Sequence, residues 1–258
     1  MSASWMDSDW SYRAVASLNR TATSGAADAT VTMLLQHQHL WDNVDTNGED
    51  IRATGPDGAS LLTFDLLSFN STTQTGTLEI QSYAGADSAH QIFYVYYGAT
   101  GKSTGVTSFV ASGVAGSMTG EQPSAPVLRL FGERPGDPNP RVVVSKHPAA
   151  TVLYTIPLPE ANLSEMLTAY QGRRGYEGWS YFTFTVSESG TPNAALVDET
   201  LVRVLSQDAT GERLAVRVAV TGGTNGTNYM GTLTLTSTLG RIEVLTFEIR
   251  ARTPVETS

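Results

Sequence analysis

Hydrophobic and polar residues alternate along much of this chain, in short blocks rich in Val, Ile, Thr, Tyr and Phe. An alternation with period two places successive side chains on opposite faces of a β-strand, so each block predicts a strand. Clusters of Gly, Asn, Asp and Pro separate the blocks and predict turns. In the first half we predict strands at Tyr12–Leu18, Ala29–Leu35, Ile51–Thr54, Phe64–Asn70, Thr75–Gln81 and His90–Tyr97.

The second half continues this pattern with one interruption. Across residues 162–171 the apolar positions recur at i, i+3, i+4 and i+7, which predicts one short helix that begins at Asn162 and stops at Gly172. Around this helix we predict strands at Val127–Phe131, Arg141–Ser145, Thr151–Ile156, Tyr181–Val186, Leu201–Leu205, Leu214–Val220, Tyr229–Ser237 and Ile242–Arg250.

Between Gly98 and Pro126 the alternation gives way to Gly, Ser, Thr, Ala and Pro. This composition predicts a linker at residues 113–126, since few of these side chains can contribute to a core. The apolar residues Val106, Phe109, Val110 and Val114 leave open a last strand of the first domain. The linker would separate a β-sandwich at residues 1–112 from a second at residues 127–258. The predicted fold class is therefore all-β, with two β-sandwich domains of jelly-roll or Ig-like type and one short helix in the second.

Composition and charge exclude several classes of function. The 258 residues carry a formal net charge of −9 without clusters of Lys and Arg, which argues against nucleic acid as a partner. The absence of cysteine excludes disulfides and thiolate metal sites. No run of apolar residues is long enough to predict a membrane span, and the start of the chain lacks the pattern of a signal peptide. We therefore expect synthesis in a cytoplasm.

An acidic run offers the strongest candidate for metal binding. Asp42, Asp45, Asn47 and Asp50 supply oxygen ligands of the kind that Ca²⁺ prefers. Their spacing departs from the EF-hand pattern, and a polar turn in which Asp and Asn bind their own backbone is the alternative interpretation. The sequence therefore predicts no resident cofactor, with a calcium loop at these four residues as a minor hypothesis.

The histidines give a weaker signal. His37 and His39 stand at strand spacing on one face, but no third metal ligand is near them in the sequence. We interpret them as a solvated strand edge and His90 as a residue that caps a strand.

Two carboxylates and two tryptophans are the candidates for catalysis and for sugar binding. Asp65 and Glu79 fall on neighbouring predicted strands, and glycoside hydrolysis needs two carboxylates that face one another. Any β-sandwich contains such pairs, and no nucleophile or nucleotide-binding motif accompanies them, so we predict that the protein is not an enzyme. Trp179, in a Gly-rich stretch, and Trp41 are the candidates for stacking on a host glycan, although packing in a core or interface is the commoner fate of Trp.

Three segments of the first half resemble a family of uncharacterised β-sandwich domains found in bacterial surface proteins and phage proteins. The family pattern is W-x-Y-R, then a D-I-R-F-like strand, then Y-Y-G. The corresponding residues here are Trp10–Arg13, Asn47–Arg52 and Phe93–Gly98, with Ala53 where an aromatic residue is usual. The resemblance implies a non-catalytic β-sandwich and no active site.

The last seventy or so residues resemble small tail, head–tail and fibre-adaptor proteins of tailed phages. The similarity rests on Gly226–Tyr229, on Thr236–Arg241 and on the closing strand Phe247–Arg250. The two resemblances together imply a non-enzymatic structural protein of a phage virion, either a capsid decoration or cement subunit or a tail or fibre adaptor. Its expected partners are other virion proteins and further copies of itself. The alternative is a carbohydrate-binding module or adhesin on the particle surface.

Overall fold

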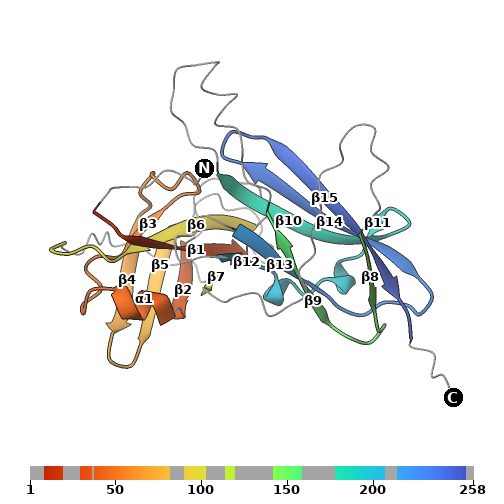
Figure 1. Cartoon of the computed structure of the whole chain (residues 1–258), viewed down its shortest axis with the longest axis horizontal. Coiled ribbons are helices and arrows are strands. Elements are labelled where there is room, and N and C mark those ends of the chain that lie inside the picture. The colour runs from red at the N-terminus through yellow and green to blue at the C-terminus, as the bar shows by residue number, and fades with distance from the viewer. Residues whose placement is uncertain are drawn as a thin grey trace.

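The computed structural model describes residues 9–19, 30–36, 38–81, 90–102, 114–119, 142–158, 178–206 and 214–253. Strands dominate these residues, and a short α-helix accompanies them, so the predicted all-β class with a short helix is confirmed (Figure 1). The predicted strands within these ranges are confirmed with small shifts at their ends. The predicted strand at Val127–Phe131 and the predicted helix near residues 162–171 lie outside the described residues.

The first half contains seven strands and the helix in its described part. They are β1 (Tyr12–Asn19), β2 (Thr30–Gln36), α1 (Gln38–Asn43), β3 (Arg52–Thr54), β4 (Phe64–Asn70), β5 (Thr75–Gln81), β6 (His90–Tyr97) and β7 (Val114–Thr119).

The second half contributes eight strands and two 3₁₀ turns to the described residues. They are β8 (Val143–Lys146), β9 (Val152–Pro157), β10 (Trp179–Glu188), β11 (Thr191–Pro192), η1 (Ala194–Leu196), η2 (Glu199–Leu201), β12 (Arg203–Ser206), β13 (Leu214–Val220), β14 (Asn228–Ser237) and β15 (Ile242–Ala251).

One large sheet runs through both halves of the chain. Its strand order is β4-β5-β2-β7-β1-β6-β10-β14-β15-β8, with β3 paired to β6 and β11 paired to β10. The link between the halves is the antiparallel pair β6 and β10, where Gln91 lies opposite Tyr181 and His90 opposite Phe182. A smaller sheet has the order β12-β13-β9. The two predicted domains are thus joined by strand pairing as well as by the chain.

The predicted linker at residues 113–126 is wrong for Val114–Thr119. These residues form β7, which pairs in parallel with β2 and antiparallel with β1. The segment is rich in small residues, so its own sequence gives little indication of a strand. Neighbouring strands on both sides supply the hydrogen bonds that its sequence pattern does not predict.

The two central strands β1 and β6 have a core on each face. In β6 all eight residues are buried, with Ile92, Tyr94 and Tyr96 in one hydrophobic cluster and Phe93, Val95 and Tyr97 in another. The first cluster extends over β9, β10 and β12 to β15, between the large and the small sheet. The second cluster lies within the first half of the chain. Because both faces of β6 are covered, its sequence is a continuous apolar run instead of an alternation.

The hairpin from β10 to β11 is closed by two residues with positive φ. Ser189 has a φ of 49° and Gly190 a φ of 84°, and Glu188 pairs with Thr191 across the turn. Positive φ at both central residues is the requirement of a type I′ turn, which matches the twist of the two strands. The turn fixes one edge of the surface depression considered below.

Among the described residues, no helix has the length and apolar character that a membrane crossing requires.

Candidate functional site

The three segments that carry the N-terminal resemblance come together in the structure. The carboxylate of Asp50 is at their centre: Oδ1 accepts a hydrogen bond from the backbone N–H of Asp45 at 3.0 Å, and Oδ2 accepts from the N–H groups of Gly98 at 2.6 Å and Ala99 at 3.1 Å. The indole Nε1 of Trp10 donates to the backbone oxygen of Asp50 at 2.6 Å. These bonds tie the loop before β3 to the end of β6 and to the start of β1.

Asp50 is 1 % exposed, and a carboxylate buried to this degree is costly unless hydrogen bonds replace its water. Three backbone donors provide this replacement, and hydrogen bonds to a charged group are stronger than neutral ones. Both carboxylate oxygens of Asp50 therefore accept hydrogen bonds from backbone N–H groups of the chain.

The predicted calcium ligands make hydrogen bonds within the chain. Asp45 Oδ1 accepts from the N–H of Asn47 at 2.9 Å, and Asp42 Oδ1 accepts from the side-chain amide of Gln38 at 2.9 Å. In the part of the chain that the structure describes, no group of three or more His, Asp or Glu side chains could hold a metal ion. Asp42, Asp45 and Asp50 are thus not brought together as a cation site, and the polar-turn interpretation describes the loop.

An aromatic cluster packs beside Asp50. Tyr12 is stacked on Tyr97 with ring centroids 5.7 Å apart, and the ring of His39 meets Tyr12 edge-on at 4.9 Å. His39 Nδ1 lies 2.8 Å from the hydroxyl oxygen of Tyr97. Burial, together with the neighbouring Tyr12, raises the pKa of Tyr97 well above its ordinary value. The interpretation of His39 as a strand-edge residue is wrong, because it lies on α1, and His37 is outside the described residues.

Cationic side chains pack against a second group of rings, Trp10, Tyr94 and Tyr96, which belong to the other hydrophobic cluster. The guanidinium carbon of Arg13, in a residue that is 1 % exposed, lies 4.5 Å from the ring centroid of Tyr94. Arg13 also donates to the hydroxyl of Tyr96 at 3.2 Å. The Trp10 ring is approached by Arg52 at 5.5 Å and by Lys102 at 4.8 Å. Such cation–π contacts stabilise the rings without opening a cavity. The motif residues thus contact one another and neighbouring side chains of the core.

The remaining sequence candidates occupy positions unsuited to the roles considered for them. Trp179 is 3 % exposed and belongs to the large core, so the interpretation of core packing is confirmed and Trp179 presents no stacking platform. Trp41 is half-buried and packs on Phe69 at 5.2 Å. Asp65 and Glu79 are paired directly across β4 and β5, so their side chains project side by side from one sheet face. That arrangement differs from two carboxylates on opposite walls of a cleft.

His90 does more than cap a strand. Its ring is stacked on Phe182 with centroids 4.7 Å apart and planes within 6°, and its Nε2 lies 3.0 Å from Glu199 Oε2. His90 belongs to β6 and Phe182 to β10, and Glu199 begins η2. The contact therefore reinforces the junction between the two halves.

The candidate functional surface is the outer face of β10, β14 and β15, which faces away from the large core. We call it the threonine face. Alternate residues of each strand point outward, and residues that lie opposite one another on the three strands form rows across the face. The first three rows are Tyr181–Thr236–Ile242, Thr183–Thr234–Val244 and Thr185–Thr232–Thr246. All nine residues are uncharged. Thr185, Ile242, Val244 and Thr246 are exposed, Thr236 is buried, and the other four are half-buried.

One end of the threonine face is apolar and exposed. Ile242 is 65 % exposed and Val244 is 53 % exposed, and Leu239 in the turn between β14 and β15 is 57 % exposed. Among the described residues, six large hydrophobic side chains are exposed, and three of the six belong to this one hairpin. Exposed apolar groups that gather on one face are characteristic of interaction surfaces.

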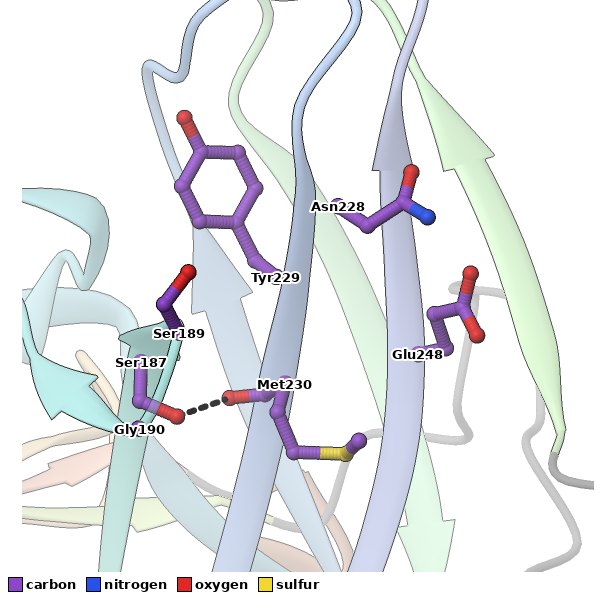
Figure 2. Close-up of a pocket in the computed structure, with 7 residues that line it drawn as sticks. All are labelled: Ser187, Ser189, Gly190, Asn228, Tyr229, Met230 and Glu248. Atoms are coloured by element: carbon purple, nitrogen blue, oxygen red, sulfur yellow. Dashed lines mark hydrogen bonds between the residues drawn. The ribbon is translucent and has the colours of Figure 1, made fainter.

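The other end of the face holds a shallow depression of about 320 Å³. It is lined by Ser187, Ser189, Gly190, Asn228, Tyr229, Met230 and Glu248. Figure 2 shows the residues of the β10 hairpin on one side of Met230, with Asn228 and Glu248 on the other.

Three polar side chains of this depression already have partners. Glu248 Oε1 accepts from Arg250 Nε at 2.7 Å, and Asn228 Oδ1 accepts from Arg252 at 3.0 Å. The hydroxyl oxygen of Tyr229 accepts from the N–H of Thr224 at 2.8 Å. The depression therefore forms the polar rim of the threonine face and does not bring reactive groups together.

Sequence reasoning identified the strands of this surface but did not recognise the surface itself. The signal was present: Thr183 and Thr185 in β10, and Thr232, Thr234 and Thr236 in β14, alternate with buried apolar residues. A search for uncharged residues at every second position would have found it.

In comparisons with known proteins, no family model matches this chain, and no curated protein matches its sequence. Both resemblances drawn from the motifs therefore remain predictions.

Proposed function

We propose that the protein is a non-enzymatic structural component of a phage virion, held in place by protein–protein contacts. The observation that carries the proposal is the threonine face, an uncharged sheet surface on three consecutive strands of the large sheet. The assignment to a virion rests on the motif resemblances of the two halves.

The construction of the sheet suits this role. A structural protein must hold its contact surface rigidly, because any ordering that occurs on binding weakens the contact. Strands β10, β14 and β15 pair along most of their length, and Phe184, Leu233 and Phe247 anchor their inner side in the large core. The contact surface is thus formed before a partner arrives.

The carbohydrate-binding alternative has less support. Sugar-binding modules present an aromatic ring to solvent so that it can stack on a pyranose. Trp179 is in the core, and Trp41 is partly covered by Phe69. A glycan would therefore have to bind without the rings that the sequence offered for it.

The proposal can be tested by fractionating purified phage particles from the source culture on a density gradient and probing the fractions with an antiserum to this chain. We expect the chain in the fractions that contain intact particles, in a fixed ratio to the major capsid or tail proteins. Recovery only among unassembled proteins would refute the proposal. If the particles are then separated into heads and tails, recovery with the heads indicates a capsid decoration subunit, and recovery with the tails indicates a tail or fibre adaptor.

A further inference from the structure

We propose that the threonine face binds the same face of a second copy of this chain. The inference rests on the proposed function, since it identifies the partner of the same contact surface. It follows from three properties of the face: its charge, its hydrogen-bonding groups and its size.

Charge permits a second copy as the occupant. Each chain carries a formal net charge of −9, so two copies repel one another at most orientations. The first three rows of the face carry no charge, and Glu248 in the next row is paired with Arg250 in the row beyond it. Two copies can therefore approach through this face without bringing like charges together.

The hydrogen-bonding groups of the face complement themselves. A threonine hydroxyl both donates and accepts, whereas a carboxylate only accepts and an ammonium only donates. Two threonine faces can therefore satisfy one another, while their methyl groups pack with Ile242 and Val244. A two-fold arrangement of this kind uses the same patch on both subunits, which is the commonest symmetry of homo-oligomers.

The size of the face predicts a weak contact. Strands β10, β14 and β15 have 10 residues each. At about 3.3 Å per residue and about 4.8 Å between strands, they present roughly 460 Å² per copy, or roughly 900 Å² for a pair. Specific interfaces begin near about 1,000 Å². We therefore expect a dimer that forms at high protein concentration and dissociates on dilution.

Sedimentation equilibrium of the whole chain, from about 10 µM to about 500 µM, tests this inference in the range expected for a small interface. The wild type should show a reversible monomer–dimer equilibrium. Val244→Glu places a charge in the uncharged rows and should weaken association at least tenfold. The matched control is Leu61→Glu, because Leu61 is 62 % exposed and lies in the first half of the chain; this variant should associate like the wild type.

Cross-linking provides a second readout that does not depend on a destabilising charge. The chain has no cysteine, so Thr246→Cys and Leu61→Cys each introduce a single thiol. A short thiol-specific cross-linker should produce covalent dimers of the first variant in preference to the second. A wild type that stays monomeric throughout, or a dimer unaffected by Val244→Glu, would overturn the inference. A monomer that still sediments with particles refutes the inference alone, whereas a dimer that is absent from particles refutes the proposed function alone.

Discussion

Replacing Asp50 by asparagine keeps the shape of the side chain and removes its charge. The carboxylate accepts hydrogen bonds from the N–H groups of Asp45, Gly98 and Ala99, whereas an asparagine offers one oxygen and one NH₂ group. In the best orientation the oxygen faces Gly98 and Ala99, and the NH₂ group then faces the N–H of Asp45. One partly buried donor loses its acceptor, and two charge-assisted bonds become neutral ones.

The magnitude follows from these losses. An unsatisfied buried donor costs about 1–3 kcal/mol, and each exchange of a charged for a neutral acceptor costs roughly 0.5–1.5 kcal/mol. We expect Asp50→Asn to lower the free energy of unfolding by about 3 kcal/mol. For a chain of this size, such a loss corresponds to a fall in Tm of roughly 6–12 °C.

Urea unfolding followed by tryptophan fluorescence measures this difference. The midpoint should fall while the slope m stays unchanged, because m reports the surface exposed on unfolding. The control is Asp42→Asn, since Asp42 is exposed and accepts a hydrogen bond from Gln38 on the same helix; its effect should stay within about 0.5 kcal/mol. Equal effects of the two substitutions would show that Asp50 does not hold the loop and β6 together.

Three further predictions concern the same region. Gly98→Ala should cost more than Gly101→Ala in urea unfolding, because both glycines have positive φ but an added Cβ at Gly98 would lie 2.6 Å from the Tyr12 ring, while Gly101 has open space. Equal costs would contradict the close packing. Addition or chelation of Ca²⁺ should leave Tm unchanged, since saturation of a genuine site at 100 times its Kd would add about 2.7 kcal/mol. Burial raises the pKa of Asp57, but hydrogen bonds from Ser60 and Ala59 outweigh it and lower that pKa below its ordinary value. The stabilisation from Asp57 is therefore present above an unfolded pKa of about 3.9 and is lost as the pH falls through the lowered folded value. The difference in unfolding free energy between wild type and Asp57→Asn should shrink on acidification over that range, and a constant difference would contradict this reasoning.

The alternation of apolar and polar residues was enough to predict most of the strands, because turn residues such as Gly, Asn, Asp and Pro bound nearly every alternating segment. Two of the elements that the pattern did not predict, β7 and α1, lacked such a signal. Val114–Thr119 is a strand only because β1 and β2 offer it hydrogen bonds from both sides. Helix α1 has 6 residues, which is too short to display a helical period.

The chemistry of the candidate residues depended on contacts that are distant in the sequence. The sequence identified Asp50 as a possible oxygen ligand for a metal ion. The residues that donate hydrogen bonds to its carboxylate, Gly98 and Ala99, are 48 and 49 residues away. The sequence therefore left a cation open as a minor hypothesis, whereas in the fold backbone N–H groups bind this carboxylate. Trp179 follows a Gly-rich stretch that suggested exposure, yet it begins β10 and its ring enters the core. In both cases tertiary structure decided between two interpretations that the sequence allowed.

The central claim is that the threonine face holds this protein in a particle. The most direct measurement is the number of copies on purified particles, determined by quantitative mass spectrometry, when wild type, Val244→Glu or Leu61→Glu is supplied to a phage that lacks the native chain. Wild type and Leu61→Glu should be incorporated equally, and Val244→Glu should be reduced at least tenfold. Equal incorporation of all three, or absence of the wild type from particles, would contradict the account.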